Sequence, residues 1–423
     1  MQDGSKINYD PLNFMRDLWA FRPYRLLFSA GFLSELGTYV SEVALLLRIY
    51  ELVGEQKQYI GITQGIFLIL MILGTLLGGV FGEGKAKNQI LVFCELARIP
   101  ILLAMLTFSS SAWVLILGNG LVAFFSGAFN PTRQALMNEM LPPGLVHRAN
   151  SLFSMSFAFL HALGPILGGL LYGSFQGIAP ILLFDLATYF VGVALLIRLF
   201  LSTPHASVLA AEPAPSTSFL EDLQAGFELV RVRADFRWLM LRCVMASSAL
   251  GIVMPLLLPM TTEVLHLPAS QYGLLLGSFG LGGAVGSLVL PGVCRKLKVE
   301  ALLRLLVLGE AFSLVAWAAL AIPLLSFPLA FVYGAFLFAR ITSQLNFVSR
   351  KLPPEFNARA NSLLDLAMVL PSVLGAGIVA LAGEQLDTAE LLQWTAVSFS
   401  AAVWLSCFLE FQQAQKRGCP PTR

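Results

Sequence analysis

Two acidic side chains lie inside the first long apolar stretch of the sequence. Glu35 and Glu42 are seven residues apart, and Tyr39 lies between them. Because seven residues are close to two helical turns, an α-helix places all three on one face. A carboxyl group in an apolar segment is costly, so it pairs or lines a pathway. Carboxyl groups also carry protons, which makes this face the first candidate for proton coupling. Alternatively, Glu42 reaches a polar boundary and Glu35 has a fixed hydrogen-bond partner.

Other polar residues in apolar stretches are secondary candidates. Glu95 and Arg98 are three residues apart and can satisfy each other on one helix. His161 could relay protons near neutral pH or be held by a local partner. Arg340 could bind an anionic group of a substrate or anchor its helix. Further polar residues that could line a cavity or brace the protein are Asn119, Tyr333, Gln344, Ser247, Ser248, Asp185 and Glu310.

Enzyme motifs are missing from the sequence. It contains no Gly-rich phosphate loop, no His-Glu-x-x-His and no Gly-x-Ser-x-Gly. The five cysteines have no metal-ligand spacing, so we expect free thiols and no metal site. The longest connection, 202–237, is too short for a nucleotide-binding domain that could drive a pump. We therefore expect no enzyme and no cofactor, and an ion or substrate gradient as the energy source.

The elements that carry these residues must be membrane helices. The chain is 57% hydrophobic and only 12% charged, against roughly 25% charged in soluble domains. Its charge-poor runs have the length of about 20 residues that spans a bilayer as a helix. The polar start of the chain argues against a cleaved signal peptide. We predict an all-α membrane protein with twelve transmembrane helices, near 26–49, 58–81, 89–108, 112–132, 151–174, 178–201, 238–260, 271–293, 300–323, 326–346, 361–383 and 390–411.

An internal repeat divides the chain into two. Residues 141–152 (LPPGLVHRANSL) return at 352–363 (LPPEFNARANSL), with eight of twelve positions identical and an offset of 211 residues. This offset is half the chain length and indicates duplication of a whole unit. We predict two homologous six-helix halves: an N-terminal bundle over 1–201, a cytoplasmic linker over 202–237 and a C-terminal bundle over 238–423. The linker starts with a Pro-, Ala- and Ser-rich stretch and continues as an amphipathic segment over 219–232.

The repeated block also contains helix punctuation. Proline lacks an N–H and disrupts the preceding turn, so Pro142 and Pro143 should stop the incoming helix. Asn150 or Ser151 should then cap the next one. The second copy repeats the pattern with Pro353, Pro354, Asn361 and Ser362.

Basic residues predict the orientation. With the N-terminus in the cytoplasm, the inner loops carry most of the Lys and Arg residues. The outer loops carry Lys57 and otherwise acids such as Glu51, Glu55 and Glu263. This asymmetry follows the positive-inside rule and predicts that both termini are cytoplasmic. The basic residues are loop anchors, so the net charge of +2 gives no reason to expect nucleic-acid binding.

Several segments resemble the major facilitator superfamily. Residues 79–87 (GVFGEGKAK) are similar to its loop 2–3 signature, with Gly79, Glu83 and Lys87, and residues 164–169 (GPILGG) resemble its antiporter glycine-proline motif. Residues 130–136 (NPTRQAL), which include Arg133, the block at 141–152 and the opening 18–28 are similar to the branch of enterobactin-exporter-like and macrolide-efflux-like proteins. Lysophospholipid transporters share the 130–152 pattern.

The resemblance implies a fold and a function. In this superfamily spans one, four, seven and ten line a central cavity, which places Glu35, Tyr39 and Glu42 at that cavity. It implies proton-coupled export of a small amphipathic compound, such as a siderophore, drug or metabolite, across the cytoplasmic membrane by a monomer. Its partners would be the substrate, protons and the lipid bilayer. The alternatives are a lysophospholipid transporter and a membrane scaffold or sensor without transport activity.

The same resemblance implies gating roles. Glu83 would form a latch with the positive start of the eleventh span, and the bend at Pro165 would seal the cavity against leak. The simpler interpretation of both motifs is helix punctuation and close packing. The gating candidates are Gly79, Glu83, Lys87, Arg133, Gly164, Pro165, Gly168 and Gly169.

Overall fold

Long helices dominate the part of the chain that the structure, a computed structural model, describes: residues 18–82, 87–175, 177–202, 228–294 and 296–416. Twelve of these helices are long and apolar enough to cross a membrane. They are α2 (Arg22–Leu52), α3 (Lys57–Gly82), α4 (Lys87–Thr107), α5 (Ala112–Met140), α6 (Pro143–Phe175), α7 (Ala179–Ser202), α9 (Ala234–Pro259), α10 (Tyr272–Val293), α11 (Val299–Ala319), α12 (Pro323–Lys351), α13 (Pro354–Ala382) and α14 (Thr388–Lys416).

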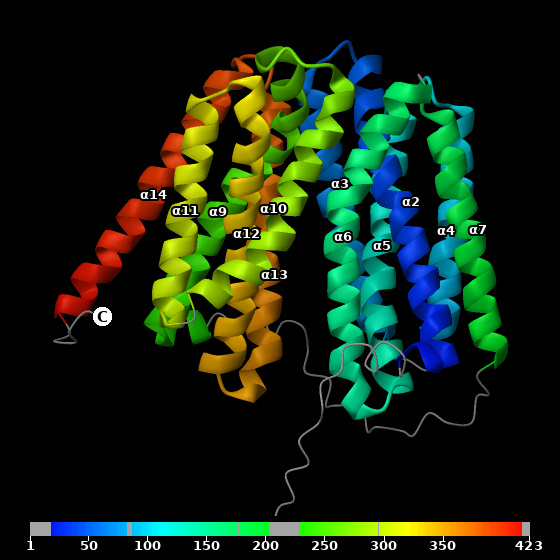
Figure 1. The fold of residues 1–423 in the computed structure, drawn as a ribbon, viewed down its shortest axis with the longest axis horizontal. Coiled ribbons are helices and arrows are strands. Elements are labelled where there is room, and N and C mark those ends of the chain that lie inside the picture. The colour runs from blue at the N-terminus through cyan, green and yellow to red at the C-terminus, as the bar shows by residue number, and fades with distance from the viewer. Residues whose placement is uncertain (1–17, 83–86, 176, 203–227, 295, 417–423) are drawn as a thin grey trace, which may run out of the picture.

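The helices form two six-helix halves that stand side by side (Figure 1). In the N-terminal half, α3 packs on α5, and α2 packs on α6 and α7. The C-terminal half repeats these pairs in the same order, with α10 on α12 and α9 on α13 and α14. The predicted membrane fold of two six-helix halves is therefore confirmed.

The halves meet through small residues. On one side of the interface α6 packs on α10, and on the other α3 packs on α13. A Cβ added at Gly169 of α6 would lie 2.5 Å from the backbone oxygen of Ser270 and 3.0 Å from Cα of Gly273. On the other side, a Cβ at Gly61 would lie 2.6 Å from the backbone nitrogen of Ala380. Small residues let helices approach this closely in a membrane, where dispersion forces drive their association.

A polar cluster joins the halves at one end, which we name the Glu263 end. Glu263 belongs to a short π-helical turn, η1 (Met260–Val264), that continues α9. Its carboxylate accepts hydrogen bonds from Tyr50 Oη (3.0 Å) and from Thr388 Oγ1. Lys57 lies 3.6 Å from the same carboxylate and donates a hydrogen bond to Thr388. Of the hydrogen bonds and ion pairs between described residues, those that cross between the halves all lie in this cluster and its neighbour Thr262.

The repeated block begins its helices earlier than predicted. We expected Asn150 or Ser151 to cap the fifth span and Asn361 or Ser362 the eleventh, and this is wrong. Helix α6 starts at Pro143 and α13 at Pro354, so these polar residues lie inside helices. Proline has the φ angle of a first helical residue and its missing N–H is unpaired there anyway, so it starts these helices. The preceding helices, α5 and α12, also run beyond the predicted spans, to Met140 and Lys351.

The connection between the halves stays a prediction. Helix α7 ends at Ser202 and α9 begins at Ala234. Most of the predicted linker and amphipathic segment, 203–227, lies outside the described residues. The four described cysteines, Cys94, Cys243, Cys294 and Cys407, are free thiols, as expected.

Candidate functional site

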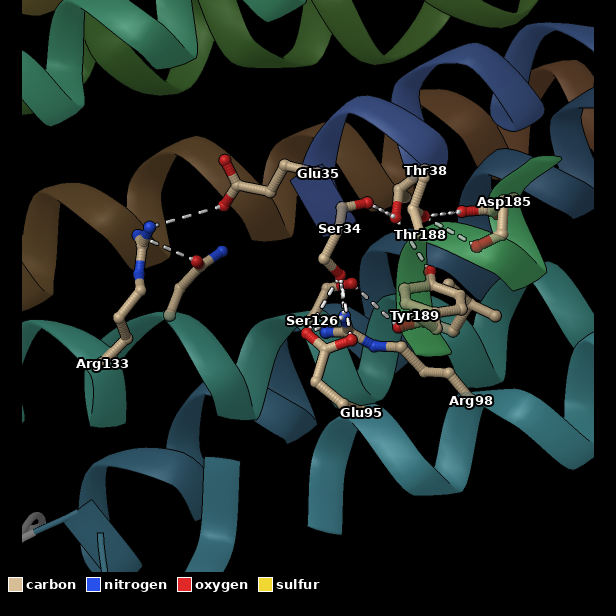
Figure 2. Close-up of polar contacts among 12 residues, drawn as sticks. Ser34, Glu35, Thr38, Glu95, Arg98, Ser126, Arg133, Asp185, Thr188 and Tyr189 are labelled. Atoms are coloured by element: carbon tan, nitrogen blue, oxygen red, sulfur yellow. Dashed lines mark hydrogen bonds and ion pairs between the residues drawn. The ribbon is translucent and has the colours of Figure 1, made fainter. Parts of the chain in front are cut away.

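The sequence's first candidate, Glu35, faces an arginine from another helix. Glu35 Oε1 on α2 lies 3.9 Å from Arg133 Nη1 on α5, and both side chains are largely buried (Figure 2). Arg133 also donates a hydrogen bond from Nη2 to Asn130 Oδ1 at 3.1 Å. Within the described part of the chain, neither Glu35 Oε1 nor Arg133 Nη1 has a hydrogen-bond partner. The two side chains therefore form an ion pair without a hydrogen bond between them.

Close helix packing and aromatic rings position Arg133. Helix α2 passes α5 at Gly31, where a Cβ would lie 3.1 Å from Arg133 Nη1. The guanidinium carbon lies 3.4 Å from the centre of the Phe153 ring and 5.9 Å from that of Phe129. A guanidinium stacked on an aromatic face keeps its edge N–H groups free to bind. Arg133 therefore presents donors to its surroundings while its face is covered.

A pocket opens next to Arg133 between α2, α5 and α6. Its polar wall includes Tyr24, which is almost fully buried and whose hydroxyl has no hydrogen-bond partner among described residues. Its apolar wall includes Phe28 and Phe153. The full lining is Tyr24, Leu27, Phe28, Arg133, Gln134, Met137, Asn150 and Phe153. Such a mixture of apolar walls and a few polar groups suits an amphipathic ligand.

An aromatic group continues from this site toward the interface. The ring of His161 on α6 lies 4.5 Å, centre to centre, from the rings of both Tyr39 and Phe157. Across the interface, Phe338 of α12 contacts His161 with ring centres 6.4 Å apart. The structure thus brings Tyr39 and His161 together and places them where the halves meet.

Glu42 stands apart from Glu35 although both belong to α2. It is half-buried and makes no hydrogen bond or ion pair with any residue that the structure describes. The phenol groups of Tyr39 and of Tyr272, from the other half, are its electrostatic neighbours. Glu42 is therefore a second free carboxylate near the interface.

A separate polar network joins α2, α4 and α7 inside the N-terminal half. Arg98 donates to Glu95 at 3.2 Å and to Ser34 Oγ at 3.2 Å, and Ser34 donates to Glu95 at 2.9 Å (Figure 2). The predicted Glu95–Arg98 pair therefore forms. Farther along, Asp185 of α7 accepts a hydrogen bond from Ser41 at 2.6 Å. Because these groups hydrogen-bond to one another, the network stabilises the packing of the N-terminal half and is not an open binding site.

The candidates on α12 lie inside the C-terminal half. Arg340 Nε donates a hydrogen bond to Glu310 of α11 at 2.5 Å, and both side chains are buried. Tyr333 packs with its ring centre 6.1 Å from that of Trp317. Gln344 lies with Arg340 along a pocket that is separate from the one at Arg133. The structure therefore does not bring these three residues to Glu35, and it pairs Arg340 with an acid.

The remaining candidates occupy other places. Asn119 is buried on α5, and its offset of 14 positions from Arg133 corresponds to about 21 Å of helix. Gly79 lies near the end of α3 with open space around it. Lys87 Nζ donates to Glu139 Oε1 at 2.5 Å, which ties α4 to α5. Glu83 lies outside the described residues.

The glycine-proline segment lies between the halves. A Cβ at Gly164 would lie 2.5 Å from Tyr39 Cβ, and one at Gly168 would lie 2.4 Å from the backbone oxygen of Val40. Gly169 faces α10 and η2 (Ala269–Gln271) of the other half, as described above, and the backbone oxygen of Pro165 meets Gly273. This segment therefore packs α6 tightly on α2 and on the other half at once.

The sequence did not identify Arg133 as the partner of Glu35, nor Tyr24 and Phe153 as its neighbours. An arginine next to an apolar stretch was the available signal. Because the predicted span ends at 132, the sequence places Arg133 among the loop anchors and in a family motif. Helix α5 continues to Met140, so Arg133 lies within the helix and is buried.

Comparisons with known proteins agree with this architecture. Residues 27–376 match the model of the Major Facilitator Superfamily. An uncharacterised MFS-type transporter of Bacillus subtilis (strain 168), YfmI, is 26% identical over 173 residues, which are 40% of this chain and 41% of that protein. The chain thus spans about two fifths of the length of this curated relative.

Solved structures show the same fold. A bacterial homologue of the human lysosomal transporter Spinster, in an inward-facing and unoccupied conformation, has a TM-score of 0.70 at 14% identity, covering 93% of this chain and 97% of that one. A peptide transporter, POT, in complex with sulfate has a TM-score of 0.71 at 13% identity, covering 92% and 94%. A bacterial homologue of the iron transporter ferroportin, in an inward-facing state, has a TM-score of 0.68 at 16% identity, covering 90% and 96%.

The helices form a membrane fold of two repeated six-helix halves, which is the fold of a class of membrane transporters. The family match spans most of the chain. The protein belongs to the major facilitator superfamily, a family of membrane transporters.

Proposed function

We propose that this protein is a secondary active transporter that exports a small amphipathic compound in exchange for protons. The Glu35–Arg133 pair is the observation that carries the proposal. Two opposite charges that are buried but held 3.9 Å apart can be separated at lower cost than a closed, hydrogen-bonded pair. A proton on Glu35 neutralises the carboxylate and leaves Arg133 without its partner. A substrate and a proton can therefore alternate at this one place.

Movement of the halves would carry the site from one side of the membrane to the other. Major facilitator halves rock around a site near the midplane. The contacts at the Glu263 end hold the halves together there, and the Arg133 pocket lies toward the opposite ends of α2 and α5. The positive-inside rule puts the Glu263 end outside and both termini in the cytoplasm. In this orientation the conformation is inward-facing, ready to load substrate from the cytoplasm.

The direction and the substrate class rest on sequence likeness. Residues 130–152 are similar to the enterobactin-exporter-like and macrolide-efflux-like branch, which favours export through the cytoplasmic membrane by a monomer. The second candidate is a lysophospholipid transporter, which the apolar wall of the Arg133 pocket favours. A lipid carrier would move its substrate without a requirement for a pH gradient.

Transport in sealed vesicles with an imposed pH gradient tests the proposal. The panel contains dyes, siderophores, macrolides and lysophospholipids, and the variants are wild type, Glu35→Gln and Glu51→Gln. Glu51 lies on the same helix, and accepts a hydrogen bond from Tyr172 far from the pocket. We expect gradient-driven export that Glu35→Gln abolishes and Glu51→Gln preserves. Transport that ignores the gradient in the wild type, or that persists in Glu35→Gln, would refute proton exchange at Glu35.

A further inference from the structure

We infer that the Arg133 pocket takes a zwitterionic head group, with its ammonium on Glu35 and its phosphate or carboxylate on Arg133. This inference rests on the proposed function and adds the substrate class. Three buried polar atoms lack hydrogen-bond partners among the described residues: Arg133 Nη1 and Tyr24 Oη, whose side chains line the pocket, and Glu35 Oε1, which lies beside it, 3.9 Å from Arg133 Nη1. Buried polar atoms are nearly always hydrogen-bonded, so unpaired atoms on and beside one pocket favour a ligand that contacts them.

The chemistry of these atoms defines the ligand. Arg133 Nη1 is a donor that binds phosphate or carboxylate well, and the hydroxyl of Tyr24 can add a second donor. Glu35 Oε1 is an acceptor that binds an ammonium. Because Oε1 and Nη1 lie 3.9 Å apart, a head group with adjacent opposite charges can contact both while they remain neighbours.

The charge balance excludes simpler ligands. A lone anion on Arg133 would draw the guanidinium from Glu35 and leave a buried carboxylate without a counter-charge. A lone cation on Glu35 would do the same to Arg133. An unpaired buried charge is strongly destabilising, whereas a zwitterion leaves both side chains paired. The binding site therefore selects against each single charge.

The rest of the pocket suits an apolar body. Leu27, Phe28, Met137 and Phe153 form its apolar wall. Phe28 continues into a row with Phe32, their ring centres 6.0 Å apart. An alkyl chain or an aromatic body attached to the head group can lie along these rings and lose its contact with water.

Binding at Glu35 has a direct consequence for coupling. An ammonium and a proton both neutralise the Glu35 carboxylate, so they compete for it. The charged or titratable groups that face Glu35 are Arg133 of α5, Arg98 and Glu95 of α4, and Tyr39 of its own helix. Arg98 is already held by Glu95 and Ser34. Because both compete for the same carboxylate, a zwitterion that binds there displaces the proton, and binding becomes an exchange.

Binding of a matched set of eight-carbon amphiphiles tests this inference. The probes are octylphosphocholine and N-octylglycine as zwitterions, octyl phosphate as the anion, octyltrimethylammonium as the cation and octyl glucoside as the neutral compound. The full chain is held in nanodiscs of phosphatidylglycerol, whose head group is not zwitterionic, and empty nanodiscs are subtracted. Calorimetric titration then gives each dissociation constant without any gradient.

We expect the zwitterions to bind at least about tenfold more tightly than the anion or the cation, since both buried charges then keep a counter-charge. Glu35→Gln should remove the preference over the anion, and Arg133→Gln the preference over the cation. Arg133→Lys should retain part of it, which separates loss of charge from misfolding. Glu51→Gln should behave as wild type. Lysophosphatidylcholine, as a further probe, distinguishes a lipid substrate from a soluble one. Tighter binding than that of octylphosphocholine indicates a lipid, and weaker binding indicates a soluble amphiphile.

Two results would overturn the inference. One is wild-type binding of octyl phosphate or octyltrimethylammonium as tight as that of both zwitterions. The other is an equal loss for all probes in both Glu35→Gln and Arg133→Gln. The proposed function can fail independently of this inference. A head-group preference without gradient-driven transport would refute proton exchange and leave the zwitterion site standing. Gradient-driven transport without a head-group preference would refute the zwitterion site alone.

Discussion

The polar cluster at the Glu263 end should set the balance between the two conformations of the transporter. Glu263 is the acceptor that Tyr50 and Thr388 share, and Lys57 is its counter-charge. Tyr50 and Lys57 belong to one half and Glu263 and Thr388 to the other. Opening this end must therefore break the contacts of Tyr50 and Lys57 with Glu263 and that of Lys57 with Thr388, whereas the Thr388–Glu263 hydrogen bond lies within one half. We predict that Glu263→Gln shifts the balance toward a conformation that is open at this end.

The size of the shift follows from the contacts. Glutamine keeps the shape and an acceptor oxygen but removes the charge. A hydrogen bond to a charged group contributes about 1.5–3 kcal/mol and a neutral one about 0.5–1.5 kcal/mol, so the Tyr50–Glu263 bond, which crosses between the halves, loses about 1 kcal/mol. The Lys57 ion pair is partly exposed and adds about 0.5–1 kcal/mol. The total of about 1.5–2 kcal/mol corresponds to a change of about 10- to 30-fold in the equilibrium constant.

Distances between spin labels across the halves measure this equilibrium. Glu55 and Gln385 are exposed residues in loops at the Glu263 end, one in each half, and can carry the labels after the native cysteines are replaced. In wild type we expect mainly the short distance, and in Glu263→Gln a large long-distance population. Glu390→Gln removes an exposed acid at the same end and is the control. A Glu263→Gln distribution that matches Glu390→Gln would show that the cluster does not hold the halves together.

Two further perturbations test the packing. Gly169→Ala should open the same end in the spin-label assay, because its Cβ would lie 2.5 Å from a backbone oxygen of the other half; Gly79→Ala, with open space around it, should not. Glu310→Gln should lower the free energy of unfolding by about 3–5 kcal/mol, because it leaves Arg340 buried without a counter-charge. Glu390→Gln should change the unfolding midpoint little, and an equal midpoint in both variants would contradict the role of this pair.

The sequence predicted the fold because membrane helices leave strong signals. Charge-poor runs locate the spans, and the repeated block at 141–152 and 352–363 establishes two halves. Both signals are local or repetitive, so no knowledge of the tertiary structure is needed. Helix ends were less predictable, because proline can stop one helix and start the next, and the choice at Pro143 depends on the surrounding turn.

Only part of the candidate site could be predicted, because the sequence does not show which helices pack against each other. Helical spacing shows that Glu35 and Tyr39 share a face, but it does not say which helix that face meets. Arg133 is 98 residues away in the sequence, and helix packing alone brings it to Glu35. The same limit hid the pairing of Glu310 with Arg340, which lie 30 residues apart on neighbouring helices. Periodicity within a segment predicts faces, whereas charge pairs between segments require the tertiary arrangement.

Helix α2 connects the two places where charges meet. It carries Glu35 at the pocket and Tyr50 at the Glu263 end, and the 15 residues between them span about 22 Å of continuous helix. Gly164 and Gly168 of α6 pack directly on its middle, at Tyr39 and Val40. A rigid helix held in this way transmits a tilt at one end to the other, because its centre is fixed against α6. We expect that neutralising Glu35 changes the geometry of Tyr50 with Glu263 without any flexible segment between them, which is the physical connection that the proposed exchange of substrate and proton requires.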